Sequence, residues 1–372
     1  MTTTIDPLLD DDLLSALGEA RAARWASPRA PYSPRIDLAH RDGRAAAAAL
    51  TSRRGATAAV KIVDVWWRDE ADAEAAAGLV DEIVARAAAA GDAAVKWEVP
   101  LGRELPGFAL ERGFVPLAPP HPSAPGTLAS HGHVRWLRDV PHEEAPYYAQ
   151  TTLYTCGAVS GLLAVEATGS VGFAGASDAA PDGSADAAPA DRPAPSIADR
   201  DLELAFWRRA SNYPAIEPVG LGVVMRETLP AETPVEVFLD HDGPVLIEAY
   251  TGFERDFRAE LQAESLRQAA TAGVPVHRTR IAIEEVARRI AGGELALLLV
   301  DEAPMHGEAG PHWVLAHAAG EGVVVIEDPW ISSDEGETWV DSHELPIAYA
   351  DLDRMVAWGE AGYRGVVFVG RR

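Results

Sequence analysis

The sequence is short of cysteine, of lysine and of long apolar runs. One cysteine, Cys156, stands among 372 residues, which excludes an intramolecular disulfide and a cysteine-based zinc site. No apolar run reaches the roughly 18–20 residues needed to span a bilayer. Residues 1–12 carry acids in place of the basic-then-apolar pattern of a signal peptide. We therefore expect a cytoplasmic protein, where a free thiol stays reduced.

Positive charge is scarce as well. Only two lysines occur, Lys61 and Lys96, and the formal net charge is −25. This charge argues against nucleic acid or an anionic membrane as a partner. No group of histidines and acids has the spacing of a metal site, so we expect no metal and no cofactor. The expected partner is a peptide or a small amide, and the oligomeric state stays open.

The composition divides the chain into three parts. Residues 1–57 are weakly patterned and are interpreted as an N-terminal extension. Residues 58–139 alternate strand-like and helix-like segments, which predicts a small α/β domain. Residues 140–372 are expected to form a second domain, interrupted at 167–200 by a segment rich in Ala, Pro, Asp, Gly and Ser. We expect this insertion to be disordered, either as a tolerated surface segment or near the mouth of a site.

Within 58–139, "AAVKIVDVWW" and "AAVKWEV" read as strands around a helix that ends near Gly91. With "FALERGFVPL", this unit resembles the C-terminal half of a GNAT acetyltransferase. The resemblance implies a Gly-rich pyrophosphate loop near 67–78. That stretch is "WRDEADAEAAAG", which is acidic and lacks glycines where backbone N–H groups would hold a phosphate. A structural or recognition module and a working transferase are both open, and the loop predicts that acetyl-CoA does not bind.

The second domain begins with the stretch "YYAQTTLYTCGAVSGLLA", which predicts a helix starting at Cys156. Apolar segments at 294–300, 312–318, 322–330 and 363–370 predict strands, and 235–250 predicts a hairpin turning at Asp242-Gly243. Helices first and an antiparallel sheet later indicate an α+β class.

Cys156 is the natural candidate for a nucleophile. The start of a helix carries partial positive charge, which stabilises a thiolate. Gly157 beside it would let a substrate approach closely. The alternative is that a lone cysteine is only a small buried hydrophobe.

A thiolate nucleophile needs a base, and the base needs a residue to orient it. His312 begins one predicted strand and Asp328 ends the next, with a turn near residues 320–322 between them. Antiparallel pairing of these strands brings the two residues to the same edge of the sheet. His306, in a predicted loop, and His317, on the other side of the strand, are the alternative bases.

Gln150 completes the predicted set. Its side-chain amide and the backbone N–H of Cys156 could both donate to the oxyanion of a tetrahedral intermediate. The pattern Gln-x5-Cys, then His, then Asp-Pro-Trp resembles the papain-like cysteine peptidases. Within them, "QTTLYTCGA" with "HWVLAH" and "VVVIEDP" is most similar to the bacteriocin-leader-processing, or double-glycine peptidase-like, family.

The resemblance implies a papain-like fold, with the cysteine helix packed on a sheet that carries the histidine and the acid. It also implies a Cys156–His312–Asp328 triad, with Gln150 in the oxyanion hole and Trp330 shielding the His–Asp hydrogen bond. Trp313 and Trp330 are further expected to contribute to substrate binding, or else to the core. The expected activity is that of a cysteine peptidase, and acyl transfer through the same thioester or an inactive peptide-binding module remains open.

Overall fold

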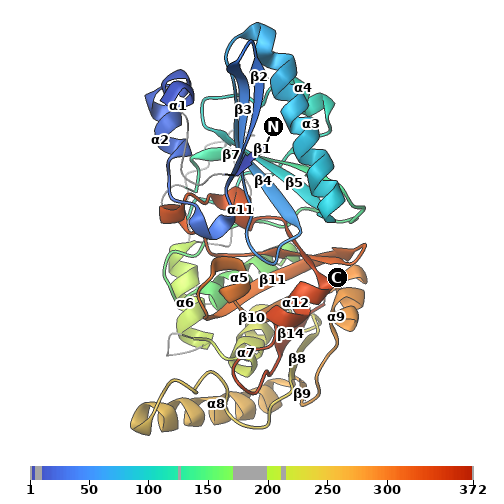
Figure 1. Ribbon diagram of the computed structural model, residues 1–372. Helices are drawn as coiled ribbons and strands as arrows, with labels where there is room; N and C mark the ends of the chain where they lie inside the picture. The colour runs from blue at the N-terminus through green and yellow to red at the C-terminus, as the bar shows by residue number, and fades with distance from the viewer. Residues whose placement is uncertain (1, 5–10, 125–126, 171–198, 211–214, 371–372) are drawn as a thin grey trace, which may run out of the picture.

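The computed structural model describes residues 2–4, 11–124, 127–170, 199–210 and 215–370. Within these ranges the strands form two seven-stranded sheets, one above the other in Figure 1. The strands of the first sheet all precede residue 137, and those of the second all follow residue 234. The predicted disordered insertion, 167–200, lies largely outside the described residues.

The first sheet has the order β1-β2-β3-β4-β5-β7-β6. Its strands are β1 (Thr2–Thr4), β2 (Arg35–Arg41), β3 (Arg44–Ser52), β4 (Ala59–Trp67), β5 (Ala94–Pro100), β6 (Val115–Pro116) and β7 (Ser130–Trp136). Neighbours are antiparallel except β4 and β5, which run parallel and are connected by helix α3 (Ala73–Ala90). This confirms the predicted strand–helix–strand unit. Gly91 ends α3 at a φ of 83°, a left-handed conformation that glycine adopts without steric cost.

This sheet reaches back well before residue 58. Strands β1, β2 and β3 belong to it, so the boundary predicted at 57/58 falls between two neighbouring strands. Strand β3 is an alanine run, and alanine intrinsically favours a helix. Its residues Ala47–Ala49 are nevertheless fully buried, with α3 on one face and helices α1 (Asp11–Leu17) and α2 (Glu19–Trp25) on the other. Tertiary burial therefore overrides the local preference.

The second sheet has the order β13-β12-β11-β10-β14-β8-β9, with only β8 and β9 parallel. Its strands are β8 (Val235–Leu239), β9 (Val276–His277), β10 (Leu295–Asp301), β11 (Pro311–Gly320), β12 (Val323–Glu327), β13 (Leu345–Ala348) and β14 (Gly365–Val369). The four strands predicted after residue 290 are confirmed. The hairpin predicted at 235–250 is wrong, because β8 pairs with β14 and β9 instead. The backbone at 245–246 is bound by the side chains of Gln262 and Tyr363.

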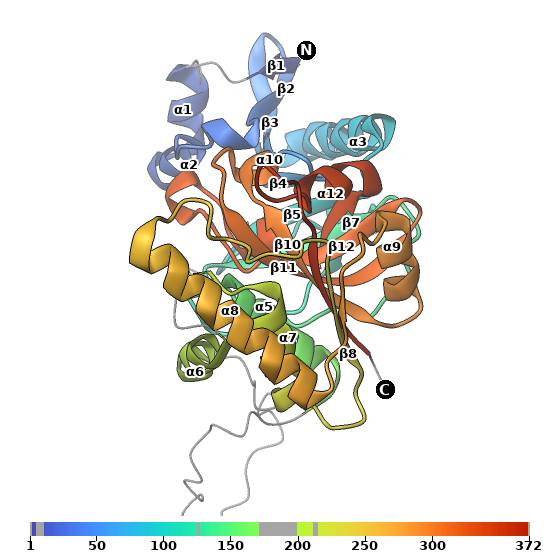
Figure 2. The same ribbon diagram turned by 90° about the horizontal axis from the view of Figure 1, so that it is seen from below.

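Helices cover both faces of this sheet (Figure 2). They are α5 (Cys156–Ala167), α6 (Arg200–Ala210), α7 (Pro218–Thr228), α8 (Gly252–Ala272), α9 (Ile283–Ala291) and α12 (Tyr349–Met355). Helices α5 and α7 pack on one face, with α6 and α8 outside them, and α9 and α12 pack on the other. Side chains of alternate residues in β10 pack into different cores. Leu297 and Leu299 pack into the core on one face of the sheet, and Leu298 and Val300 pack into the core on the other. The chain is therefore of mixed α+β class.

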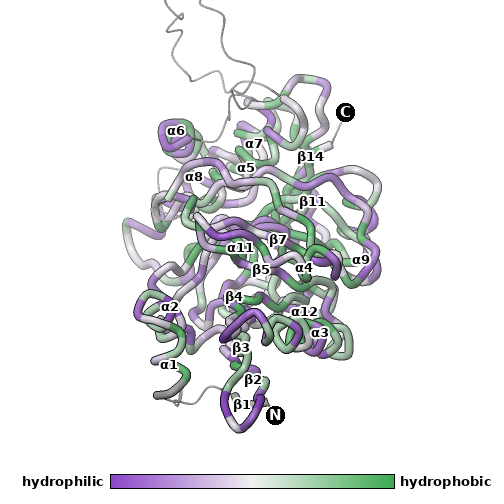
Figure 3. The backbone as a smooth tube through the Cα atoms, turned by 90° about the horizontal axis from the view of Figure 1, so that it is seen from above, coloured by the Kyte–Doolittle hydropathy of each residue, from purple (hydrophilic) through white to green (hydrophobic). Residues whose placement is uncertain are grey.

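Figure 3 shows hydrophobic stretches concentrated in the strands, with hydrophilic residues along α6 and at the tip of the β2–β3 hairpin. None of the described helices combines the length and the apolar character that a membrane crossing requires.

The two sheets meet across the short helix α11 (Trp339–Ser342). The Trp339 ring is buried against Gly132 of β7, and its Nε1 donates to the Ser130 carbonyl at 3.0 Å. Both lysines of the chain lie in this interface. Lys61 pairs with Glu98 at 2.8 Å and with Asp341, and Lys96 donates to the carbonyl of Val340 at 3.0 Å. Since buried charges are tolerated only when paired, these contacts hold the two halves in one defined arrangement.

Candidate active site

Cys156 is the first residue of α5, as predicted, and it is 8 % exposed. The helix consists mostly of small and apolar residues and packs against β10 and β11. Its glycines allow close contact, since a Cβ at Gly161 would lie 2.7 Å from the ring of Phe206. Ser160 fixes the helix further by donating to the carbonyl of Trp313 at 3.0 Å. This packing sets the thiol against the sheet.

His312 and Asp328 lie on neighbouring antiparallel segments, which confirms the predicted pairing. His312 is the second residue of β11, and Asp328 directly follows β12. The His312 Nε2 lies 2.7 Å from Asp328 Oδ1, and neither residue is more than 3 % exposed. The Cys156 side chain also acts on the His312 ring, since it is one of the groups that raise the pKa of His312. The three residues of the predicted triad are therefore brought together.

The charges of the site favour an imidazolium. Burial lowers the pKa of His312, but the Asp328 carboxylate and the Cys156 side chain outweigh it and raise that pKa well above the ordinary value. For Asp328, burial acts to raise the pKa, while the charges of His312 and Arg54 hold it well below its usual range. A buried carboxylate next to a protonated imidazole is the arrangement that orients a catalytic histidine.

Gln150 reaches the same place from the loop before α5. Its backbone N–H donates to the Pro329 carbonyl at 2.9 Å, which ties it to the residue after Asp328. Its side-chain Nε2 donates to the Thr152 carbonyl at 2.8 Å. Because a carbonyl only accepts, the amide orientation is defined, and the second Nε2 hydrogen is free for a ligand. The Oε1 atom is buried, and no described residue donates a hydrogen bond to it.

A cleft of about 460 Å³ opens over these residues. Apolar, acidic and imidazole side chains from four segments line it: Gln150, Leu153, Cys156, Glu302, His306, Glu308, Pro311, His312 and 330–335. The thiol and the imidazole thus lie in a cleft large enough to admit a peptide side chain.

A model of the Peptidase_C39 like family matches residues 187–370. The match includes His312 and Asp328 and begins after Gln150 and Cys156. The C-terminal part of the chain is therefore similar to a peptidase-like family, in agreement with the peptidase part of the sequence prediction.

Two acetyltransferases are among the solved structures to which the chain is similar. Aminoglycoside 6'-acetyltransferase type Ii is 14 % identical, with a TM-score of 0.29, over 38 % of this chain and 99 % of its own. The ribosomal-protein-S18-alanine N-acetyltransferase from Escherichia coli is 11 % identical, with a TM-score of 0.27, over 36 % and 91 %. No curated protein matches the chain.

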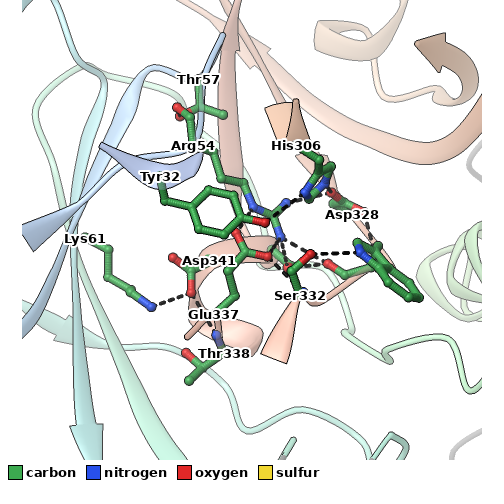
Figure 4. A network of polar contacts seen from close by, with 12 residues as sticks. Tyr32, Arg54, Thr57, Lys61, His306, Asp328, Ser332, Glu337, Thr338 and Asp341 are labelled. Carbon is green, nitrogen blue, oxygen red and sulfur yellow. Dashed lines mark hydrogen bonds and ion pairs between the residues drawn. The ribbon is translucent and has the colours of Figure 1, made fainter. Parts of the chain in front are cut away.

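Arg54, between β3 and β4, extends from the first half of the chain into the site (Figure 4). Its guanidinium lies 2.6 Å from Asp328 Oδ2 and is also bound by Glu337 at 2.8 Å. It donates further to Ser342 Oγ at 2.7 Å and to the Trp330 carbonyl at 3.1 Å. The Arg54 side chain is 2 % exposed. The carboxylate that orients His312 is thus itself held by a residue of the other sheet's domain.

A second contact from the first half passes through His306. The His306 Nε2 lies 3.2 Å from Asp328 Oδ2, and its Nδ1 lies 3.3 Å from the Tyr32 hydroxyl (Figure 4). His306 belongs to the short helix α10 (Ala303–His306) and lines the cleft. It shares Asp328 with His312, but His312 is closer to that carboxylate, at 2.7 Å, and Cys156 is one of the groups that raise the pKa of His312. This geometry favours His312 over His306 as the base.

The three residues predicted to bind substrate are placed differently. Trp330 lines the cleft, and its backbone N–H donates to Asp328 Oδ1 at 2.8 Å. Gly157 and Trp313 lie instead in the core: a Cβ at Gly157 would meet the Trp313 ring at 3.0 Å and Ile216 at 3.2 Å. The glycine therefore serves the packing of α5, because Trp313 fills the space beside it. This corrects the substrate-binding assignment of both residues.

Arg54 and Tyr32 were not foreseen from the sequence. Arg54 is 274 positions from Asp328, and nothing in "TSRRGAT" separates it from the neighbouring arginine. Its only distinguishing property is burial, which becomes visible once both halves are folded together.

The described residues that could hold a metal ion are His317, Glu327 and Glu344, which are all buried. His317 Nε2 lies 3.1 Å from Glu327 Oε1 and 3.5 Å from Glu344 Oε1. The outer oxygens of the two carboxylates are held by His343 and His142. None of these five residues lines the cleft around Cys156. His317, the other alternative base, is thus part of a separate group.

The acidic stretch after β4 is the segment in which the acetyltransferase resemblance implies a phosphate-binding loop. Strands β4 and β5 pair only as far as Ile62 and Trp97 and then separate. The turn that follows β4 is closed by Asp69, which accepts from the Ala71 N–H at 3.0 Å. Asp72, which is 2 % exposed, pairs with Arg41 at 2.6 Å. Asp69 therefore occupies one N–H group of the turn in which a phosphate would have to bind.

Proposed function

We propose that this protein is a papain-like thiol hydrolase that cleaves a peptide bond, or a similar amide, through an acyl-enzyme on Cys156. The observation that carries the proposal is the placement of Cys156 and His312 in one cleft, with His312 hydrogen-bonded to Asp328. The family-model match over residues 187–370 supports a peptidase-like activity. The sequence motifs around Cys156 and His312 extend the proposal to processing of the bacteriocin-leader type.

The reaction begins with transfer of the Cys156 proton to His312. The sulfur attacks the substrate carbonyl, a C–S bond forms, and negative charge develops on the oxygen. The free Nε2 hydrogen of Gln150 and the N–H of Cys156 donate to that oxyanion. His312 then gives its proton to the leaving nitrogen as the C–N bond breaks, which releases an amine and leaves a thioester.

Hydrolysis of the thioester uses the same groups, with His312 now acting first as a base toward water. His312 removes a proton from water, the hydroxide adds to the thioester carbonyl, and the C–S bond breaks to release the acid. The sulfur then recovers its proton from His312. Asp328 keeps the imidazole oriented and stabilises its charged form in both halves of the cycle.

The test is reaction of the full chain with an electrophilic thiol probe, followed by mass spectrometry of the modified peptide. We expect a covalent adduct at Cys156 that forms faster than with free cysteine at pH 6. The Cys156→Ala variant should keep the fold, as judged by its far- and near-UV circular dichroism, and lose all turnover of peptide substrates. Turnover by Cys156→Ala at the wild-type rate, or probe labelling no faster than that of free cysteine, would overturn the proposal.

A further inference from the structure

The cleft beside Cys156 carries an unusual balance of charge. Four carboxylates line it, from Glu302, Glu308, Asp334 and Glu335, and none of the described lysines or arginines does. Elsewhere in the described structure many acids are paired, as Asp64 is with Arg21 at 2.8 Å. Among the described residues, these four carboxylates have no arginine or lysine within ion-pairing distance. Among the described residues, the basic groups on the wall are the imidazoles of His306 and His312.

These acids come from two separate segments. Glu302 and Glu308 belong to the connection between β10 and β11, on either side of α10. Asp334 and Glu335 belong to the 3-10 turn η3 (Ser333–Glu335), which follows the triad aspartate. Residues from both segments line the same cleft, so their like charges act on the same volume. Like charges brought together in this way repel one another until a cation lies between them.

Glu302 and Glu335 are less exposed than the other two acids. The burial of Glu302 has a resolved effect on its charge. This residue is half-buried, and that burial raises the pKa of its carboxyl despite the opposing charges of His312 and His306. A carboxylate held partly out of water without a lysine or arginine partner gains more from an incoming cation than a fully hydrated one does.

Gln150 provides an independent indication of a ligand. It lines the cleft beside Cys156 and is 95 % buried, and its Oε1 accepts no hydrogen bond in the described structure. Buried polar atoms without a partner are rare, because the lost hydration is not replaced. This acceptor fits a ligand that brings N–H donors, such as a peptide with a basic side chain.

We propose that the cleft binds peptide substrates through a lysine or arginine side chain close to the scissile bond. The inference rests on the proposed function for the bond that is cleaved, but the charge preference of the cleft is a property of its own. Apolar wall residues such as Trp330 and Ile331 suit the aliphatic stem of a basic side chain, while the acids suit its charged end.

The experiment compares internally quenched peptide libraries that differ at one position at a time between arginine and citrulline, which has nearly the same shape without the charge. We expect kcat/KM to be at least about tenfold higher for arginine at one position next to the scissile bond, which is a gain of about 1.4 kcal/mol. The preference should shrink in 1 M NaCl, where the Debye length is about 3 Å.

Variants assign the preference to the cleft. In Glu302→Gln, and in Asp334→Asn combined with Glu335→Gln, the ratio of arginine to citrulline should fall several-fold. Glu264→Gln is the matched control, since Glu264 lies on α8 and does not line the cleft, and the ratio should stay unchanged. Equal rates for the two libraries, a preference for citrulline or acidic residues, or the same fall in the control would overturn the inference.

Failure of the proposed function would be recognised separately. If no library is cleaved and Cys156 takes up no thiol probe, the hydrolase proposal fails, and the charge inference is decided by binding. Fluorescence anisotropy with Cys156→Ala then compares arginine-containing and citrulline-containing fluorescent peptides. Tighter binding of the arginine peptides, with the difference lost in Glu302→Gln, would support a cation-binding cleft. Equal binding of the two peptides would refute the charge inference.

Discussion

Replacement of Arg54 by methionine tests most directly whether the first half of the chain supports the site. Methionine keeps most of the length and the apolar stem but removes the charge. The change leaves Asp328, at 0 % side-chain exposure, and Glu337, at 2 %, without the guanidinium that binds both. Removal of one partner from a buried ion pair typically costs about 3–5 kcal/mol, because the remaining charge stays buried. We expect Arg54→Met to lower the free energy of unfolding by that amount.

The assay is urea denaturation followed by circular dichroism, with Arg112→Met as the matched control. Arg112 pairs with Asp81 at 2.7 Å, but that carboxylate is 55 % exposed, so the control should lose less than about 1 kcal/mol. The double variant Arg54→Met with Glu337→Gln should recover part of the loss, since one unpaired charge is gone.

The same variant has an expected pH signature. Arg54 is one of the charges that depress the pKa of Asp328, so its removal should raise that pKa. A carboxyl with a depressed pKa contributes stability above its unfolded value of about 3.9, which is lost as the pH falls through the folded pKa. In Arg54→Met, the loss of stability and of Cys156 labelling should therefore begin at a higher pH. If Arg54→Met stays within 1 kcal/mol of the wild type and keeps its labelling profile, the argument for Arg54 is refuted.

Three further predictions follow from the site and its surroundings. Asp328→Ala should lower kcat/KM less than His312→Ala, because orientation is lost but the base remains; equal losses in steady-state kinetics would contradict this order. Burial acts to lower the pKa of His343, but Glu327 and Glu144 raise it to about 10. Its stabilisation is full below the unfolded value of about 6.5 and is lost as the pH approaches 10, so wild-type stability should decline more over this range than that of His343→Gln in urea denaturation. Acetyl-CoA should produce no heat of binding in calorimetry, because acidic residues occupy the turn after β4, and micromolar affinity would show that reasoning to be wrong.

The arrangement of His312 and Asp328 was predictable because it depends on short-range topology. Two apolar segments joined by a glycine-containing turn pair antiparallel in almost any sheet, and the ends of such a pair must meet. The start of α5 at Cys156 was predictable for a similar reason, since a run of small apolar residues after a polar loop favours a buried helix. Both inferences required only neighbours along the chain.

The errors have the opposite origin. Strand β3 was missed, since residues 1–57 were interpreted as a weakly patterned extension, and burial on both faces makes its alanine run a strand. The segment 235–250 has the composition of a hairpin, but β8 finds its partners more than 30 residues away. Gly157 and Trp313 were assigned to substrate binding from their position beside functional residues, and packing places them in the core. In each case a distant contact outweighs the local pattern.

The sequence by itself therefore determined the α+β class, the strand that carries His312, and the identity of the candidate nucleophile. Only the tertiary structure decided that, from the first half of the chain, Arg54 binds Asp328 and Tyr32 contacts His306. It also gathered the unpaired carboxylates of the cleft, which come from separate segments. The physical reason is that burial and ion pairing depend on contacts between side chains that are distant in the sequence, and the pattern of residues along the chain does not contain that information.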